Sequence, residues 1–492
     1  MAKCIMVQGT MSGAGKSLLV TALCRIFRQD GWRVAPFKSQ NMALNSFVTP
    51  DGLELGRAQA AQAEAAGLDC DVRMNPVLLK PNSDTGSQLI VLGKPRGSFE
   101  AREYFQMKRA LLPEILAAYR SLAAENDILV IEGAGSPAEI NLRADDIVNM
   151  GLAEAVNAPV LLVGDIDRGG VFAQLYGTVA LLRPEERRRV VGTVINKFRG
   201  DVSLLEPGLR ELEALCGVPV LGVLPWLKTE LDEEDSLAPR LTRDSTPRAL
   251  DIAVLRLPHL ANFTDFAPLE DHPAIGLRYV NRLEQLGRPD LLLLPGTKNT
   301  MGDLVWLRES GFFAAIRTLA AGGTPVFGVC GGYQMLGARL DDPEGVERRG
   351  SLEGLGLLPV ETRFVSEKLR ARRRALCTAG PLAGARLEGY ELHMGRTQRF
   401  GGEAFCTLED GGEDGARLKN VFGSYLHGLF DSGELSAKLA DFLAARRGIE
   451  IPHVTPPPRA LRRERDYDRL ADAVRKNLDL PAVYRAMEEF HA

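Results

Sequence analysis

The chain is predicted to be an α/β protein with two doubly wound domains, and three features of its sequence predict this. Short apolar runs alternate with helical patterns over residues 1–227, and a second series of the same kind occupies residues 251–445. Residues 228–250 lack apolar periodicity and are rich in charge, proline and serine. Such alternation predicts parallel strands covered by helices. We therefore expect two domains, a linker at 228–250 and a helical tail at 446–492.

The apolar runs give the expected order of strands. In the first domain they cover 4–9, 32–38, 127–133, 158–165, 190–197 and 219–226, and in the second 251–258, 291–296, 325–330 and 423–428. In the tail, Leu470, Ala473, Val474 and Leu478 share one helical face within 467–490. We expect this segment to pack on the body of the protein, in preference to forming a binding module.

Composition favours a globular protein that handles small molecules. The chain has 492 residues, 45% of them hydrophobic, and a net charge of -4, which provides no basic field for nucleic acid or a membrane surface. Its seven cysteines are scattered without a CxxC pair, as in reducing compartments. The first strand leaves no room for a signal peptide, and we expect a cytoplasmic protein. The sequence leaves homo-oligomerisation open.

A phosphate-binding loop is predicted directly after the first strand. Residues 8–20 read QGTMSGAGKSLLV, a glycine-rich loop followed by Lys-Ser at the start of a helix. Backbone N–H groups and Lys16 can surround the phosphates of ATP there, and the Ser17 hydroxyl can ligate Mg²⁺. Thr10 holds the position at which the first glycine of the motif is usual, and Gly13 and Gly15 complete the predicted loop.

Polar residues at later strand ends extend this site. Glu132 ends an apolar strand, where a carboxylate can face a metal ion held by Ser17; the alternative is a solvated acid. Asp165 and Asp167 are placed similarly. Asn196 and Lys197 resemble an Asn-Lys turn that recognises a nucleotide base.

The second domain carries a cysteine at an abrupt strand end. Gly328 and Gly331 flank Cys330 and permit a sharp turn into a helix, so we expect an exposed, reactive thiol close to backbone N–H groups. The N–H groups of Gly331 and Gly296 are candidates for an oxyanion site. His427 follows another apolar run, and together with Cys330 it predicts a Cys-His acyl-transfer site. The alternatives are a buried structural cysteine and a structural histidine.

These residues resemble the class I glutamine amidotransferase family, whose pattern G-x-C-x-G-x-Q is met at Gly328, Cys330, Gly332 and Gln334. The resemblance implies that the cysteine attacks the side-chain amide of glutamine, forms a thioester and releases ammonia, with the histidine as base. Most members carry a glutamate two residues after the histidine, where this chain has Leu429. The acid that orients His427 is therefore not identified by the sequence.

The GTxSxxGKS loop resembles that of the dethiobiotin synthetase-like ATPases, which phosphorylate a carboxylate. In that family the glutamate matching Glu132 ligates Mg²⁺. Partition-type ATPases carry a signature lysine where this chain has Met11. The two resemblances together imply amide synthesis, in which ATP activates a carboxylate and glutamine supplies ammonia.

Longer segments resemble the cobyric acid synthase family of the cobalamin pathway. They cover 36–46, 51–67, 74–94, 165–178, 196–201 and 389–395. The resemblance implies ATP-dependent amidation of the b, d, e and g carboxylates of adenosylcobyrinic acid a,c-diamide, giving adenosylcobyric acid. It also implies a Cys-His pair without a following glutamate, which accounts for Leu429.

Residues that contact the corrinoid are expected in two polar segments. Lys38, Gln40, Asn41 and Lys80 lie in segments suited to a surface that holds a polycarboxylate. Glu391 and His393 support either the glutaminase site or a domain interface, and the sequence does not decide between them. Two alternative functions are a cobyrinic acid a,c-diamide synthase and a partition-type nucleotide switch with a vestigial glutaminase fold.

Overall fold

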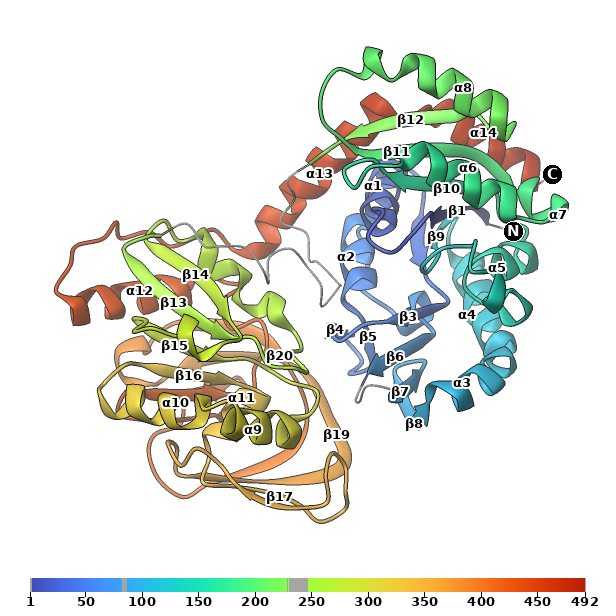
Figure 1. The fold of residues 1–492 in the computed structure, drawn as a ribbon. Coiled ribbons are helices and arrows are strands. Elements are labelled where there is room, and N and C mark those ends of the chain that lie inside the picture. Colours follow the sequence, from blue (N-terminus) through green and yellow to red (C-terminus); the bar gives the residue numbers. More distant parts are fainter. Residues whose placement is uncertain (1, 82–85, 228, 230–246, 492) are drawn as a thin grey trace. The chain divides into compact units, whose positions relative to one another are not determined.

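A computed structural model describes residues 2–81, 86–227, 229 and 247–491 (Figure 1). It divides into two compact units. Unit 1 comprises Met1–Ala43, Leu53–Asp232 and Arg463–Ala492, and unit 2 comprises Leu44–Gly52 and Glu233–Arg462. Most of the expected linker, 228–250, lies outside the described residues.

Unit 1 is built on a six-stranded parallel sheet of order β12-β11-β10-β1-β9-β2. Its strands are β1 (Lys3–Gly9), β2 (Val34–Phe37), β9 (Ile128–Glu132), β10 (Val160–Asp165), β11 (Val190–Phe198) and β12 (Val220–Pro225). Strands are added on both sides of β1 in this order. Because the crossover connections between parallel strands are right-handed, the helices that connect strands on one side of β1 cover the opposite face from those on the other side. The loops that follow β1, β9 and β10 therefore meet at one edge of the sheet.

Helices and a smaller sheet complete the N-terminal part of unit 1. The helices are α1 (Lys16–Gln29), α2 (Arg57–Ala66), α3 (Ala101–Met107), α4 (Leu112–Glu125), α5 (Met150–Ala155), α6 (Val171–Leu181), α7 (Pro184–Arg187) and α8 (Glu206–Cys216). The smaller sheet joins β3 (Gln40–Met42), β6 (Val77–Pro81), β7 (Gly86–Val91) and β8 (Lys94–Glu100) in the order β3-β6-β7-β8. A short strand, β5 (Glu54–Gly56), precedes α2.

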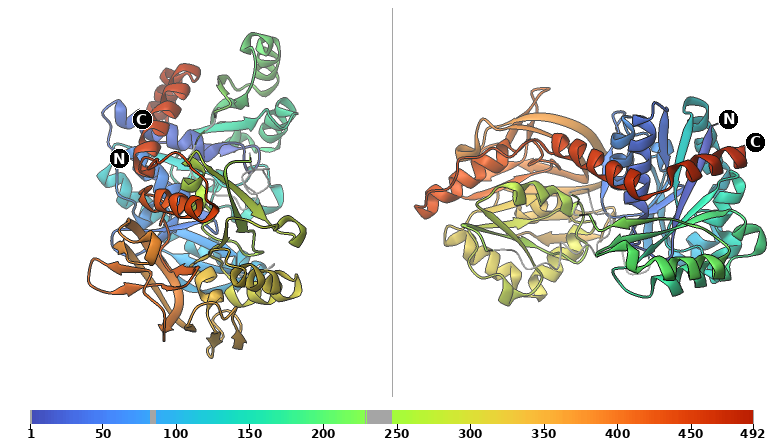
Figure 2. Two further views of the ribbon diagram at one scale, coloured as in Figure 1. Left: turned by 90° about the vertical axis from the view of Figure 1, so that its left-hand side faces the viewer. Right: turned by 90° about the horizontal axis from the view of Figure 1, so that it is seen from above.

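The tail forms two helices, α13 (Arg459–Asn477) and α14 (Leu480–His491). The expected continuous pattern is interrupted because Pro481 cannot continue a helix interior, and Asp479 accepts a hydrogen bond from the N–H of Ala482 at 3.0 Å. Apolar side chains of both helices join the core of α1 and the central sheet. The two ends of the chain lie close together (Figure 2), where Lys3 Nζ is 3.2 Å from a carboxylate oxygen of Glu488.

Unit 2 contains a second parallel sheet of order β14-β13-β15-β16-β24, with β23 added antiparallel at the edge. Its strands are β13 (Leu250–Leu255), β14 (Ile275–Val280), β15 (Leu291–Leu294), β16 (Val326–Val329), β23 (Ala416–Leu418) and β24 (Val421–Ser424). Its helices are α9 (Thr300–Glu309), α10 (Phe312–Ala321), α11 (Gly331–Leu336) and α12 (Glu434–Arg447), with the 3₁₀ segment η6 (Phe263–Asp271).

A further, mostly antiparallel sheet in unit 2 was not expected from the sequence. It joins β17 (Arg339–Asp342), β18 (Gly350–Glu353), β19 (Val360–Cys377), β20 (Arg386–Arg399), β21 (Cys406–Leu408) and β22 (Glu413–Asp414). The short strand β4 (Ser46–Val48) also belongs to unit 2.

The predicted fold class is confirmed: the protein is α/β, with a doubly wound domain in each half and a helical tail. Within the described part of the chain, no helix combines the length and apolarity that crossing a bilayer requires.

Candidate active site

The predicted phosphate loop lies between β1 and α1 in unit 1. Gly15 takes a left-handed backbone conformation, with φ of 102°, directly before the helix begins at Lys16. The Lys16 ammonium group folds over the loop and donates to the carbonyl oxygens of Met11 and Gly135, each at 3.0 Å. The loop thus presents the N-terminus of a fourteen-residue helix together with a lysine held above it.

Glu132 is buried at the end of β9, next to this helix start. Its Oε1 accepts hydrogen bonds from Ser17 Oγ and Lys38 Nζ, both at 2.8 Å, and its Oε2 accepts one from Gln62 Nε2 at 2.5 Å. Burial raises the pKa of the Glu132 carboxyl, but the Lys38 charge and the three hydrogen bonds outweigh burial and leave that pKa below its ordinary value. Glu132 is therefore a carboxylate at neutral pH.

The donor set around Glu132 suits a hard divalent cation. A hydroxyl and a carboxylate oxygen, Ser17 Oγ and Glu132 Oε1, lie within 2.8 Å of each other beside the phosphate loop. No cluster of three or more acidic, histidine or cysteine ligands occurs among the described residues. The pair of oxygens on Ser17 and Glu132 matches the way Mg²⁺ is usually held, by one or two protein oxygens together with phosphates and water.

The predicted base-recognition turn packs against the back of the phosphate loop. Asn196 Nδ2 donates to the carbonyl of Ala14 at 2.9 Å, and Lys197 Nζ donates to the carbonyl of Gly13 at 2.7 Å. Lys197 also pairs with Asp165 at 2.7 Å. Asn196 and Lys197 thus contact the loop directly, whereas Asp165 forms an ion pair with Lys197 and does not contact Ser17.

Two other predicted residues of this region contact side chains near the loop. Thr10 Oγ1 donates to Gln174 Oε1 at 3.1 Å. Asp167 pairs with Arg199 at 3.2 Å on the surface.

The residues predicted to hold the substrate form ion pairs or hydrogen bonds with other side chains of unit 1. Lys38 is paired with Glu132, and Lys80 is paired with Glu54. Gln40 Oε1 accepts from Tyr104 Oη at 2.5 Å, and Asn41 Nδ2 donates to Gln59 Oε1 at 3.0 Å. The expectation of a surface was wrong for Lys38, Asn41 and Lys80, whose exposed fractions are 6%, 2% and 4%. The parallel pairing of β3 with β6 helps to enclose Asn41 and Lys80.

Cys330 stands in unit 2 at a strained turn between β16 and α11. Its φ is 52° and its ψ is -108°, an uncommon backbone conformation for a residue with a side chain. The following helix lies so close to β15 that a Cβ on Gly332 would be 2.0 Å from the carbonyl oxygen of Leu294. The expected exposure was wrong, because Cys330 is only 8% exposed and its Sγ lies 3.8 Å from the carbonyl oxygen of Leu392 on β20.

Parallel strands bring the other predicted residues of this site to the same edge. β16 lies between β15 and β24, so the turns that carry Gly296, Cys330 and His427 are neighbours. A Cβ placed on Gly296 would be 3.1 Å from His427 Cε1 and 3.8 Å from Cys330 Cβ. Gly331 packs against the turn that follows Gly296, since its Cβ would lie 3.1 Å from the N atom of Thr297. All four predicted residues therefore come together.

An acid that the sequence did not identify contacts the histidine. Asp265 Oδ2 lies 2.6 Å from His427 Nδ1, and Asp265 Oδ1 accepts the N–H of Gly428 at 3.2 Å. Burial lowers the pKa of His427, but the charges of Asp265 and Cys330, with their hydrogen bonds, raise it to about 10. The imidazole is therefore held in its charged form beside the thiol at neutral pH.

Two further groups frame the imidazole. The Asn262 side-chain amide lies 3.4 Å from Nδ1 and 3.3 Å from Nε2 of His427, and the Tyr390 ring stacks on it with centroids 5.2 Å apart. Asn262 and Asp265 follow β13, a strand of the same parallel sheet, and this position was the signal in the sequence. Leu429, at the place usual for the acid, is 1% exposed in the core.

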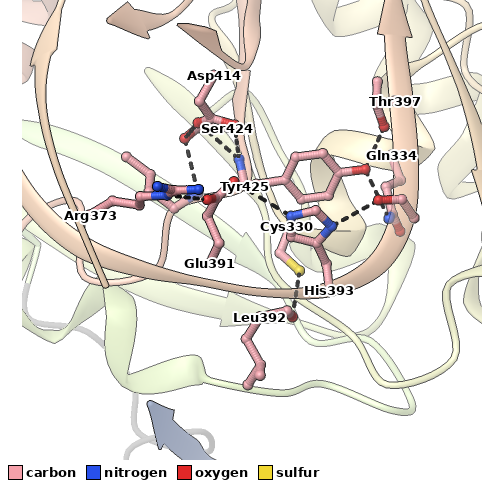
Figure 3. Close-up of polar contacts among 12 residues, drawn as sticks. Cys330, Gln334, Arg373, Glu391, Leu392, His393, Thr397, Asp414, Ser424 and Tyr425 are labelled. Atoms are coloured by element: carbon pink, nitrogen blue, oxygen red, sulfur yellow. Dashed lines mark hydrogen bonds and ion pairs between the residues drawn. The ribbon is translucent and has the colours of Figure 1, made fainter. Parts of the chain in front are cut away.

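A buried polar network supports the strands around Cys330 (Figure 3). Tyr425 Oη accepts from Gln334 Nε2 at 3.1 Å, and the Tyr425 N–H donates to Asp414, whose pKa burial raises to about 6. The His393 ring stacks on the Tyr425 ring with centroids 3.6 Å apart. Glu391 pairs with Arg373 at 2.5 Å. Glu391 and His393, left open by the sequence, are thus buried within unit 2.

Residues near the end of the polar segment 40–46 lie close to His427. The Ser46 N–H donates to Asn262 Oδ1 at 3.2 Å, and the Ser46 carbonyl accepts from Tyr390 Oη at 3.0 Å. The Phe47 ring packs edge-on against Tyr390 with centroids 5.2 Å apart. Residues Leu44–Gly52 are therefore structural neighbours of the Cys-His site, a placement that the sequence did not predict.

Comparisons with known proteins agree with a nucleotide-binding domain in the first half of the chain and a glutamine amidotransferase domain in the second. Residues 5–237 match the CobQ/CobB/MinD/ParA nucleotide binding domain, and residues 251–435 match the CobB/CobQ-like glutamine amidotransferase domain. The cobyric acid synthase of Ruminiclostridium cellulolyticum is 53% identical over 99% of this chain and 98% of its own length. Those of Lachnoclostridium phytofermentans and Yersinia enterocolitica are each 52% identical over 99% of this chain, and over 100% and 98% of their own lengths.

Proposed function

Since this chain belongs to the cobyric acid synthase family, we propose that it is an ATP-dependent, glutamine-hydrolysing amide ligase of cobalamin biosynthesis. Its substrate is adenosylcobyrinic acid a,c-diamide, and its product, after amidation of the b, d, e and g carboxylates, is adenosylcobyric acid. One observation carries the proposal: a single chain holds a phosphate loop beside Glu132 and a Cys330–His427 pair at a strained strand end.

Ammonia is made in unit 2. The Cys330 thiolate, stabilised by protonated His427, attacks the side-chain amide carbon of glutamine, and the developing oxyanion is received by the N–H groups of Gly296 and Gly331. The charged imidazole then gives its proton to the departing nitrogen, and ammonia leaves a glutamyl thioester. Water, deprotonated by the now neutral His427, hydrolyses the thioester and restores the thiolate. Asp265 holds Nδ1 throughout and stabilises the imidazolium each time it forms.

The carboxylate is activated in unit 1. Lys16 and the N-terminus of α1 hold the phosphates of ATP, and transfer of the γ-phosphoryl group converts the carboxylate into an acyl phosphate, which ammonia attacks with loss of phosphate. Ser17 and Glu132 are the residues that would hold Mg²⁺, whose charge helps to neutralise the phosphates. Lys38, buried beside Glu132, adds a positive charge next to the residues that would hold Mg²⁺.

Neither alternative function is favoured. The relatives that match nearly the whole chain are cobyric acid synthases, which disfavours the a,c-diamide synthase. The contact between the Cys330 and His427 turns is not expected of a partition-type switch, and Met11 stands where such proteins carry their signature lysine.

The proposal is tested by the mass of the corrinoid after incubation with ATP, Mg²⁺ and glutamine. Each exchange of a carboxylic acid for an amide lowers the mass by a single unit, so the a,c-diamide should pass through four successive decreases. An unchanged a,c-diamide, or conversion of cobyrinic acid to the a,c-diamide, would contradict it.

A further inference from the structure

A pocket beside the phosphate loop has the C-terminal helix as one of its walls. It is lined by Gly15 and Leu18 from the loop and α1, by Asn196 and Trp226 from the ends of β11 and β12, and by Leu470, Ala473 and Val474 from α13. All of these residues belong to unit 1. The tail is therefore in contact with the same cavity as the predicted nucleotide-binding residues.

Specific contacts fix α13 in this position. Arg25 of α1 pairs with Asp468 at 2.8 Å and with Glu464 at 2.9 Å. The end of α13 lies against β12 so closely that a Cβ on Gly222 would be 2.3 Å from the carbonyl oxygen of Asn477. Val474 is 2% exposed and belongs to the core of unit 1. The wall is thus part of the folded unit and not a loosely attached tail.

The chemistry of the pocket suits a flat aromatic group. Leucine, valine and alanine side chains form the α1 and α13 walls, an indole ring stands near them, and Asn196 supplies a polar group. Apolar walls with a few polar groups are typical of pockets that bind bases and cofactors. Because Gly15 belongs both to the phosphate loop and to the lining, a ligand whose phosphates rest on the loop is well placed to extend into this cavity.

We propose that α13 forms one wall of the base-binding part of the ATP site, so that Leu470, Ala473 and Val474 contact the purine ring. The inference rests on the proposed function, in which ATP binds the phosphate loop. It assigns to the last part of the chain a direct role in nucleotide affinity, although this part is separated from the loop by the whole of unit 2 in sequence.

The test compares two ligands on the full-length protein: Mg²⁺-ATP, and Mg²⁺-tripolyphosphate, which has the phosphates without a base. Ala473→Trp fills the pocket, Ala473→Leu fills it less, and Asp472→Trp places the same indole on the exposed neighbouring position as a control. Binding is measured by titration calorimetry. Tripolyphosphate binding, which needs the phosphate loop of unit 1, reports that this unit is folded in each variant.

We expect Ala473→Trp to weaken ATP binding at least about tenfold, because it removes the apolar contact of the base, with a smaller loss for Ala473→Leu. Tripolyphosphate binding should not change in either variant, and the control should bind both ligands normally. Unchanged ATP affinity in Ala473→Trp, or equal losses for the two ligands, would overturn the inference alone. A wild-type protein that does not bind ATP would overturn the proposed function as well.

Discussion

Asp265 and His427 show how a residue's role is set by position in a fold and not by spacing in sequence. They are separated by 162 positions, yet the carboxylate lies 2.6 Å from the imidazole because both follow strands of one parallel sheet. Where most class I amidotransferases place the acid two residues after the histidine, this chain has a core leucine. An aspartate in the 3₁₀ segment η6 contacts the ring instead.

Replacement of Asp265 by asparagine should therefore alter the pH dependence of glutamine hydrolysis. Asp265 contributes to the rise in the pKa of His427 to about 10. Without its charge, His427 loses its proton at lower pH and no longer stabilises the thiolate. We expect glutaminase turnover to fall roughly a hundredfold or more, and its alkaline limb, which reports loss of the His427 proton, to move to lower pH.

The matched control is Asp441→Asn, which removes the acid of another His-Asp pair in unit 2, where His453 lies 2.9 Å away on the surface. Asp265→Glu should restore part of the activity. A profile of glutamine hydrolysis against pH that is the same in Asp265→Asn and the wild type would show that Asp265 does not act through His427.

Close packing of elements decides where the tail attaches. Gly222 of β12 faces the carbonyl of Asn477, and Asp479 donates its N–H to the Leu221 carbonyl at 2.8 Å. A side chain on β12 at this point would push α13 away from the sheet and from the pocket beside the phosphate loop.

We accordingly predict that Gly222→Ala lowers the free energy of unfolding of unit 1 by about 1–3 kcal/mol, the usual range for overpacking. The control is Gly177→Ala in α6, where a Cβ would meet no atom within 4 Å. That change should be neutral or slightly stabilising, because alanine favours a helix interior. Urea denaturation of both variants checks the prediction, and equal stabilities would refute it.

The sequence predicted those elements that are apolar throughout. Parallel strands such as β9 and β15 are buried on both faces and read as continuous apolar runs. The antiparallel sheet was missed because β19 carries the stretch LRARRRA, in which charged side chains on the partly exposed strand conceal its pattern. The break between α13 and α14 was missed as well, although Pro481 marks it.

The sequence predicted those parts of the candidate site that consist of residues adjacent in the chain. The phosphate loop, Glu132 and the cysteine elbow are recognisable because their geometry depends on adjacent residues. Asp265, Gln62 and the packing of Leu44–Gly52 near His427 depend on contacts between distant segments, which a single sequence does not display. Burial of Lys38 and Lys80 escaped prediction for the same reason, since each lysine is paired with a distant carboxylate.

The chain combines two chemistries, glutamine hydrolysis and carboxylate activation, and they should be separable by mutation. Lys16→Ala removes the charge above the phosphate loop, so we expect amidation to fall by roughly a thousandfold or more with either glutamine or free ammonia as nitrogen source. Glutamine hydrolysis itself should persist, because Cys330 and His427 are untouched.

Lys476→Ala, at an exposed position in the last turn of α13, is the control for loss of a lysine. The rates of corrinoid amidation and of glutamate release are measured for both variants and for the wild type. Ammonia-dependent amidation that survives in Lys16→Ala would exclude the phosphate loop from carboxylate activation.

Nitrogen released at Cys330 should become the amide of a carboxylate that is activated in unit 1. The most direct test is the mass of the corrinoid formed from glutamine labelled with heavy nitrogen in its side-chain amide, in the presence of unlabelled ammonium, by the wild type and by Cys330→Ala. We predict that the wild-type product carries the heavy label in its new amides and that the Cys330→Ala product forms only unlabelled amides. Heavy amides made by Cys330→Ala, or no amidation by the variant at any ammonium concentration, would show that Cys330 is not the source of the nitrogen or that the two activities are not separate.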